Sequence, residues 1–414
     1  MPAPLTLEEE AALAFAACGI TGRALGELPY QTGNVADAGG GNIMGSFVGR
    51  TVASGDALHA TSVIVINDEG AWFLKRPHDF DSSQIDALIQ AAREERLVEI
   101  YEKMRVKIAD GRVTVPREVP YCPPFNKWSA NIPGSTYFLP VIEYTALYIN
   151  MLLAAFSPDI GMFLLDERNG FKPAGIGQFA KSKGGHLDDT SPADGSPPTN
   201  VGTIGFIESA LFQLAGLEEG AMLQNLALMA QALGLGGFPH AAEHPKWLEA
   251  LGFRVLGVPF SKVFGLGVLE TLAARLLHKD VPVPTAVGLE RDGVTLLSTY
   301  CPPYYSKMED AVRAFVATKF GKGKGIYRDH GRDAPFLDGA KAEAAVPNYS
   351  EEAIAATVAY CSYVHDRFGR FPAGNAPLAT LLAYQAHRLD TTFYDQFYPP
   401  EALSETQRQR EETP

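Results

Sequence analysis

Residues 240–244 of this 414-residue chain read His-Ala-Ala-Glu-His and match the H-x-x-E-H pattern of zinc proteases. That chemistry needs both histidines on one face of a continuous helix, with the glutamate placed as general base. Pro239 and Pro245 flank the segment and leave barely one helical turn. Pro245 also disfavours a helical conformation at His244. A polar loop is therefore the favoured interpretation, and a zinc site is the alternative.

Residues 319–332 interleave glycines with basic side chains, in the order KFGKGKGIYRDHGR. Such a loop could cradle a phosphate, but the G-x-x-x-x-G-K-[ST] spacing of a Walker loop is absent. A solvated surface loop is the favoured interpretation. The alternative is a phosphate site, and it bears on the cofactor considered below.

Residues 361–372 hold a third candidate group near the C-terminus. His365 and Asp366 could orient a general base, and Cys361 and His365 have the four-residue spacing that could share a metal on a helix. Neither pair has a third partner identifiable in the sequence. Because aromatic-rich segments usually bury area, packing or a subunit contact is favoured here.

Two further segments are informative about function only when they are considered together. Residues 50–59 (RTVASGDALH) suggest a tight turn before a strand, and residues 219–239 (EGAMLQNLALMAQALGLGGFP) a helix that ends in glycines. Together and in this order they resemble the FMN-dependent nitroreductase superfamily, most closely the branch of azoline dehydrogenases. Residues 5–21 resemble the helix that begins the core of that branch. The resemblance covers roughly residues 5–75 and 205–255, and the second block is the more specific.

The resemblance implies a flavoprotein in which FMN lies between the two subunits of a homodimer. Glycines would let backbone N–H groups approach the reactive N5 edge of the flavin without a Cβ clash. No catalytic side chain is required, because the flavin carries the hydride and the protein positions it. NAD(P)H is the expected electron donor, and the acceptor is a small molecule that the sequence does not identify. The resemblance implies that Arg50 and Ser54 hold the phosphate and ribityl end of FMN. Gly236, Gly237 and Phe238 would lie beside the isoalloxazine. The other expected cofactor-binding residues are Gly55 and Asn225.

The sequence also departs from the pattern of this family. The Arg-Arg-Ser segment that usually grips the FMN phosphate has no clear counterpart, Ala53 replaces a proline, and Asp56 adds a negative charge where phosphate is expected. A binding or structural protein that kept the fold and lost the flavin is therefore the alternative function. Metal-dependent hydrolysis through residues 240–244 is a third hypothesis.

Hydrophobic periodicity indicates the elements that would position these residues. The clearest signal is a helix over 208–233, whose apolar residues recur at three- and four-residue steps. β-rich runs at 61–67 and 71–75 predict a hairpin. The remaining expected helices cover 7–17, a long amphipathic stretch from 81 or 82 to about 109, 141–156, 351–366 and 378–389, and the chain after 259 is expected to be mostly helical.

The expected fold class is α+β, with a nitroreductase-like mixed sheet flanked by helices. The core would span 1–260 with an insertion at about 76–204, and 261–414 would form a helical C-terminal extension.

A formal net charge of −13 argues against nucleic acid or an anionic membrane as the main partner. The four cysteines are far apart, which fits a reducing compartment without structural zinc. With no basic leader and no apolar run long enough for a bilayer, the sequence predicts a cytoplasmic protein.

Overall fold

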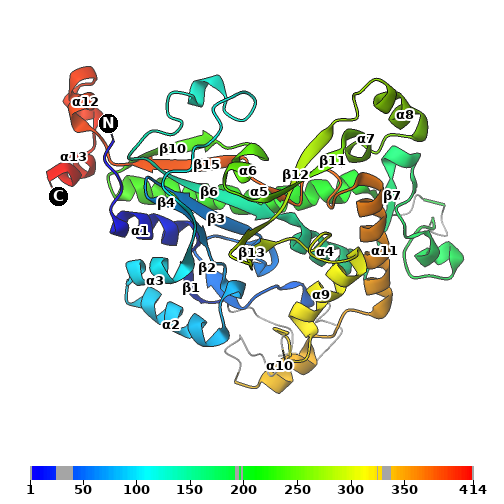
Figure 1. Ribbon diagram of the computed structural model, residues 1–414. Helices are drawn as coiled ribbons and strands as arrows, with labels where there is room; N and C mark the ends of the chain where they lie inside the picture. Colours follow the sequence, from blue (N-terminus) through cyan, green and yellow to red (C-terminus); the bar gives the residue numbers. More distant parts are fainter. Residues whose placement is uncertain are drawn as a thin grey trace.

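The computed structural model describes residues 2–24, 41–191, 195–196, 199–323, 325–328 and 337–412. The described residues form an α+β fold built on one seven-stranded sheet with helices around it (Figure 1). The strand order is β10–β15–β6–β3–β4–β5, and β14 pairs with β6. Every pairing described within this sheet is antiparallel, and the parallel pair β7–β9 belongs to a small separate sheet.

The strands of the main sheet are β3 (Thr61–Ile66), β4 (Gly70–Leu74), β5 (Arg105–Asp110), β6 (Thr136–Glu143), β10 (Gly236–Ala241), β14 (Leu378–Ala379) and β15 (Leu382–His387). The principal helices are α1 (Leu7–Cys18), α2 (Ser82–Arg93), α3 (Leu97–Met104), α4 (Tyr144–Ala155), α5 (Ile204–Ala232), α9 (Met308–Phe320) and α11 (Glu351–Phe368). The shorter helices are α6 (Lys246–Ala250), α7 (Phe260–Val263), α8 (Val268–Leu276), α10 (Gly339–Ala345), α12 (Thr391–Phe397) and α13 (Glu405–Glu412). The other strands are β1 (Ile20–Arg23), β2 (Val48–Arg50), β7 (Phe163–Asp166), β8 (Lys172–Pro173), β9 (Val201–Thr203), β11 (Arg254–Pro259), β12 (Pro282–Arg291) and β13 (Val294–Ser298).

The hairpin of β3 and β4 confirms the prediction from the β-rich runs. Both strands are fully buried, as expected for strands covered on both faces of a sheet. The turn is held by the Asn67 side chain, whose Oδ1 accepts from the amides of Glu69 (2.8 Å) and Gly70 (3.3 Å). This local turn chemistry fixes the register that places Thr61 at one end of the sheet and Ile66 at the other.

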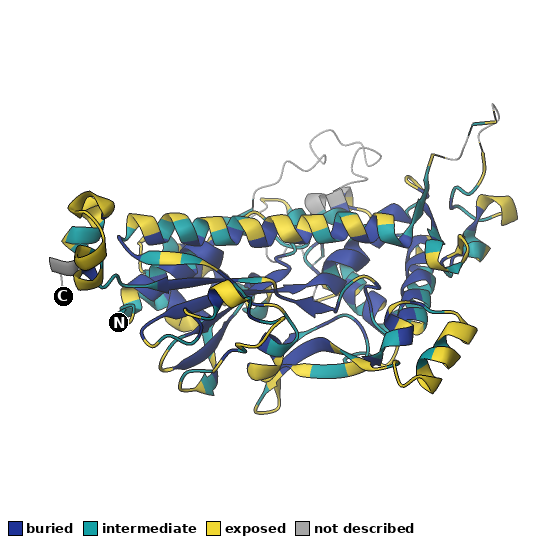
Figure 2. Ribbon diagram, turned by 90° about the horizontal axis from the view of Figure 1, so that it is seen from above, coloured by how far each residue is buried: buried dark blue, intermediate teal, exposed yellow. Residues whose placement is uncertain are grey.

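Helix α5 confirms the strongest helix prediction and runs along one side of the molecule (Figure 2). The distribution of charged and apolar side chains between its buried and exposed faces is unusual. Its only charged residues, Glu208, Glu218 and Glu219, are all buried, whereas Leu217 is 70 % exposed and Phe206 is 62 % exposed. Solvent-facing helix surfaces usually carry the charges. The outer face of α5 is thus uncharged and partly apolar.

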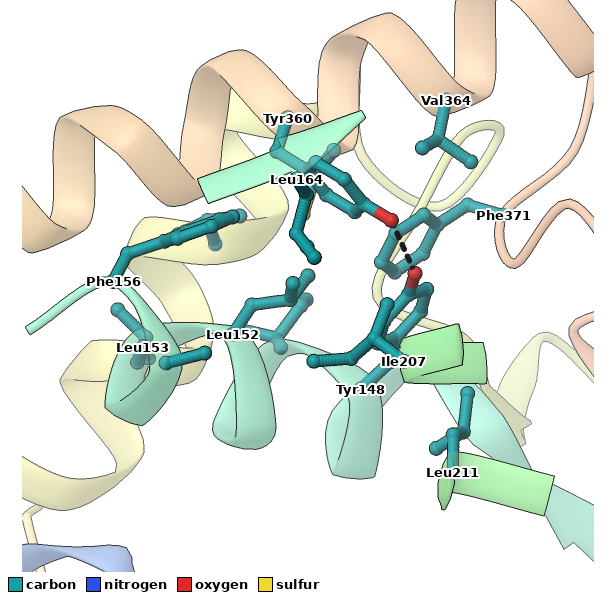
Figure 3. Packing of buried hydrophobic residues seen from close by; sticks show 14 of the residues in the cluster. Tyr148, Leu152, Leu153, Phe156, Leu164, Ile207, Leu211, Tyr360, Val364 and Phe371 are labelled. Atoms are coloured by element: carbon teal, nitrogen blue, oxygen red, sulfur yellow. Dashed lines mark hydrogen bonds between the residues drawn. The ribbon is translucent and has the colours of Figure 1, made fainter. Parts of the chain in front are cut away.

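A second core joins α4, α5 and α11 beyond the sheet. Tyr148 on α4 and Tyr360 on α11 share a hydrogen bond of 2.6 Å between their hydroxyls, and the Phe371 ring stacks on Tyr148 at 4.8 Å (Figure 3). Leu211 of α5 belongs to the same buried cluster. Because two buried hydroxyls satisfy each other, the tyrosines pack here without an unpaired polar group.

Two helix predictions were wrong. The expected helix up to residue 109 is interrupted at Glu95, which has a left-handed φ of 56°, and its last part is strand β5. The expected helix over 378–389 is β14 and β15 instead. Leu and Ala favour helices, but β15 lies between β10 and β6, so pairing on both sides overrides the local preference.

The expected division of the chain does not coincide with the limits of the sheet. Strand β6 lies within 76–204 and is a central strand, paired with β3, β14 and β15. The segment 261–414 supplies β14 and β15 and also contains the hairpin of β12 and β13, so it is not purely helical. The main sheet is therefore built from strands that come from all three expected parts of the chain.

Candidate functional site

The seven expected cofactor-binding residues fall into two groups at opposite ends of the main sheet. Phe238 pairs with Gln385, Gln385 with Tyr137, and Tyr137 with Ile66, so β10 reaches the far end of β3. Arg50 bonds instead to Thr61, at the start of β3. At ~3.3 Å per residue and ~4.8 Å per strand, Thr61 and Phe238 lie roughly 20 Å apart. The two groups therefore do not line one site within a single chain.

Arg50 is the last residue of β2, and its guanidinium is hydrogen-bonded to backbone carbonyls of the protein. Its Nε donates to the carbonyl of Cys18 (3.0 Å) and one terminal nitrogen donates to the carbonyl of Thr61 (3.2 Å). The residue is only 9 % exposed. A buried guanidinium held by two carbonyls ties the end of α1 to the start of β3, and it presents little of its charge to a phosphate.

Ser54 opens a strained turn. Its hydroxyl donates to Glu218 (2.7 Å) and accepts from the amide of His59 (2.8 Å). Asp56, Ala57 and His59 have positive φ values of 55°, 50° and 52°. Left-handed backbone is uncommon for residues other than glycine, and such strain persists only where surrounding contacts hold it.

The neighbours of this turn attach it to α5. A Cβ added at Gly55 would meet nothing within 4 Å, so the backbone there faces open space. Asn225 on α5 donates to the carbonyl of Thr51 (3.1 Å). Glu218, about two turns earlier on the same helix, accepts from the amide of Thr61 (2.8 Å) as well as from Ser54. Helix α5 thus holds the whole first group together.

Lys319 lies behind the same turn, a position that the pattern of residues 319–332 did not predict. It ends α9 and is 1 % exposed. Asn150 bridges it to the turn, because its Oδ1 accepts from Lys319 and its Nδ2 donates to Asp56 (3.0 Å). The other acceptors near Nζ are the carbonyls of Asn42 (2.8 Å) and Ile43 (3.0 Å) and the hydroxyl of Tyr349 (3.1 Å).

Burial shifts both charged groups of this cluster towards neutrality. It lowers the pKa of Lys319 to about 7, and the charge of Asp56 opposes that shift. Burial also raises the pKa of Asp56, against the hydrogen bond from Asn150. Asp56 therefore faces Asn150 inside the protein rather than adding a charge at an open phosphate site.

The two described cations at the ends of the basic loop do not form an open phosphate cradle, whereas Lys322 between them is exposed. Lys319 is buried as described, and Arg328 donates to the carbonyl of Tyr327 and also contacts Asn348. Lys324 and Arg332 lie outside the described residues. The cations that the structure describes at both ends of this segment are thus bonded to protein oxygens.

The second group lies on β10, at the open edge of the sheet. Among the described strands it pairs with β15 alone, and in an antiparallel pair alternate residues turn their N–H and C=O groups away from the partner. Ala242 donates inward to Leu381 (2.9 Å), whereas Ala241 donates outward to the Asn126 side chain (3.3 Å). Pro239 and Gly237 are in phase with Ala241. The N–H and C=O of Gly237 therefore point outward, and Gly237 is exposed.

The other face of Gly237 is closed. A Cβ added there would meet the ring and the hydroxyl of Tyr384, and at Gly236 it would meet His387 and Leu389. Both glycines are needed for packing against β15 side chains. A larger residue at 237 would therefore disturb the strand itself and not only a ligand beside it.

Phe238 points to the opposite face, where aromatic and unpaired polar groups gather. Trp128 stacks on its ring at 5.8 Å. Beneath it, His240 and Gln385 are buried, and the His240 Nε2 and Gln385 Oε1 atoms have no hydrogen-bond partner. His240 Nδ1 lies 2.8 Å from the Ala241 carbonyl, so Nδ1 is positioned to donate to it. The sequence did not single out Trp128 or Gln385.

The zinc interpretation fails on geometry. His240 is in strand β10 and His244 lies between that strand and α6, so the two are not on one face of a helix. Cys361 and His365 are both on α11, where Cys361 is fully buried and His365 faces Asp366 at 3.7 Å. Within the described ranges, no group of three or more His, Cys, Asp or Glu residues is arranged to hold a metal.

Comparison with known proteins gives no relative: the chain matches no protein-family model, no curated protein and no solved structure. In the part of the chain that the structure describes, no helix has the length and apolar character needed to cross a membrane.

Proposed function

We propose that this protein is an FMN-dependent oxidoreductase with a nitroreductase-like architecture. It would pass two electrons, as hydride, between a donor such as NAD(P)H and a small organic acceptor, and it would act as a homodimer. The observation that carries the proposal is the exposed backbone of Gly237, whose N–H and C=O point away from the sheet beside an aromatic pair. The flavin supplies the hydride chemistry when bound, so the chain needs to contribute positioning and not an acid or base.

The residues fit the two ends of FMN unequally. The segment 236–238 fits the ring, because a glycine backbone on an edge strand offers a donor and an acceptor with no side chain in front of them. Arg50 does not fit the phosphate, since its guanidinium bonds to the carbonyls of Cys18 and Thr61. The phosphate end would need other cations or a rearrangement of Arg50.

The homodimer is supported by the outer face of α5. Phe206, Leu217 and Leu228 are 62 %, 70 % and 55 % exposed there, and the helix has no exposed charge. Exposed apolar stretches of this kind mark interaction surfaces.

The test is a visible absorption spectrum after incubation with excess FMN and removal of unbound flavin. The proposal expects a retained flavin band that NAD(P)H bleaches. Light scattering should give a dimer for the wild type and a monomer for Leu217→Lys. Val294→Lys, at a valine 58 % exposed on strand β13, is the matched control and should leave the dimer intact. Absence of retained flavin would contradict the proposal.

The second candidate is a protein that keeps this fold without the flavin. The internal hydrogen bonds of Arg50 and the burial of Asp56 favour it, because neither residue then serves a phosphate. This candidate predicts no retained flavin but an unchanged dimer, so the same two measurements separate it from the oxidoreductase.

A further inference from the structure

Trp128 and Phe238 form an exposed aromatic pair whose position is fixed by the fold. Their rings stack with an angle of 19° between planes, and Trp128 remains 69 % exposed. Phe125, on the same loop, is 73 % exposed. This loop arches over β10 in Figure 1. Large aromatic side chains left in solvent on a well-packed segment indicate a binding surface.

The loop that presents Trp128 is firmly attached on both sides of the tryptophan. Asn131 exchanges two hydrogen bonds with the backbone of Val115, at 2.8 and 3.1 Å. Gln385 of β15 donates to the carbonyl of Ser129 (2.9 Å), and Asn126 accepts from β10. The exposure of the Trp128 ring therefore belongs to the folded arrangement, because its neighbours in sequence are bonded to the sheet.

Beside this pair, the outward edge of β10 has one backbone donor, at Gly237, and two acceptors, at Gly237 and Pro239, to which no described residue is hydrogen-bonded. Of the outward-facing positions, Pro239 has no N–H and Ala241 is bonded to Asn126, which leaves Gly237. A single residue is too short for another strand to pair with. It matches a small planar group in which a carbonyl lies next to an N–H, so that both can bond to one residue.

We infer that Gly237, Phe238 and Trp128 bind a planar ring that bears adjacent C=O and N–H groups, with Trp128 stacking on the ring as a positioning residue. Two cofactor rings have this chemistry: the isoalloxazine of a flavin and the carboxamide-bearing ring of nicotinamide. The inference rests on the proposed function only for the flavin ring, and it needs neither the phosphate nor Arg50.

Equilibrium dialysis of the full chain tests this with two probes, lumiflavin, which has the flavin ring without ribityl phosphate, and nicotinamide. At least one should bind the wild type, and Trp128→Leu should weaken it at least about fivefold, the lower end of what one aromatic stacking partner contributes. Trp128→Phe should retain most of the affinity. Trp72→Phe, at a tryptophan 6 % exposed in β4, is the matched control and should leave the affinity for both probes unchanged.

The ring chemistry is tested with N,N-dimethylnicotinamide and with lumiflavin methylated at N3, which lack the N–H. Each should bind more weakly than its parent. Binding of lumiflavin alone assigns the site to flavin, and binding of nicotinamide alone assigns it to the donor. Binding of neither, or equal binding by Trp128→Leu and wild type, overturns the inference.

The outcomes for FMN separate this inference from the proposed function. Lumiflavin or nicotinamide bound through Trp128, without retention of FMN, supports the ring site and contradicts the proposed cofactor. FMN retained equally by wild type and Trp128→Leu supports the cofactor and contradicts the role of Trp128.

Discussion

At one end of the main sheet, around Ser54 and Lys319, polar side chains bond to one another and to backbone carbonyls. At the other end, on β10, the backbone of Gly237 is exposed and its N–H and C=O point away from the sheet. Groups satisfied internally stabilise a fold, whereas a backbone donor and acceptor exposed in a fixed arrangement are available to a ligand. We infer from this difference that the first end is chiefly structural, and we propose the second as the binding end.

The largest expected effect is that of replacing Lys319, which tests whether the first end of the sheet is structural. Lys319→Met would remove the ammonium donor from the carbonyls of Asn42 and Ile43 and from the Asn150 amide oxygen, which would then have only the Tyr349 hydroxyl and Asn150 Nδ2 as donors. We expect the free energy of unfolding at pH 7 to fall by about 1–3 kcal/mol, the usual cost when a buried acceptor loses a donor. Lys322→Met, at an exposed lysine of the same segment, is the control. Equal effects of the two substitutions in denaturant titrations would contradict a structural role for Lys319.

The pH dependence of that loss sharpens the assignment. Burial lowers the pKa of Lys319 to about 7, whereas an unfolded lysine titrates near ~10.4. Between these values the unfolded state binds more protons, so the contribution of Lys319 to stability rises with pH. The difference in unfolding free energy between wild type and Lys319→Met should therefore grow by about 2 kcal/mol from pH 7 to pH 9. A difference that stays constant with pH would mean that Lys319 is not the titrating group.

At the β10 end, Gly237→Val tests packing and binding together. The added side chain would meet Tyr384, so we expect a loss of about 1–2 kcal/mol in stability from overpacking. FMN retention should fall as well, because the strand edge shifts. Gly55→Ala, where a Cβ meets nothing within 4 Å, is the matched control at the other end and should change neither quantity measurably. Undiminished flavin content in Gly237→Val would remove Gly237 from the site.

The smallest expected effect is that of Ser54→Ala. It leaves Glu218 Oε2 and the His59 amide without the hydroxyl that joins them, which should cost about 1 kcal/mol in thermal or chemical unfolding. If the first end is structural, FMN affinity should be unchanged in this variant. A large loss of FMN affinity with unchanged stability would instead return Ser54 to the cofactor site.

The sequence predicted the elements whose pattern is local. The helix over 208–233 and the hairpin of β3 and β4 follow from periodicity and turn residues, and both are confirmed. The strand β15 was missed because its residues favour a helix and only pairing with β10 and β6 makes it a strand. The same distant pairing determines which backbone atoms of Gly237 are free.

The site shows the same limit. The resemblance singled out Gly236 and Gly237 as residues that would let the backbone approach a flavin, whereas their close packing against Tyr384 and His387 is visible only in the structure. The partners of Asp56 could not, because Asn150 and Lys319 lie far away in sequence and meet it only through α4 and α9. Trp128 likewise reaches Phe238 through a loop whose path the local sequence does not determine.

Under the proposed function, a flavin ring binds the backbone of β10 at Gly237. Hydrogen–deuterium exchange with and without FMN tests it most directly, because the outward N–H of Gly237 is exposed in the free protein and would donate to the ring in the complex. We predict that FMN slows exchange in peptides containing 236–241 and leaves peptides containing 54–59 unchanged. Protection at 54–59 with none at 236–241 would contradict the claim.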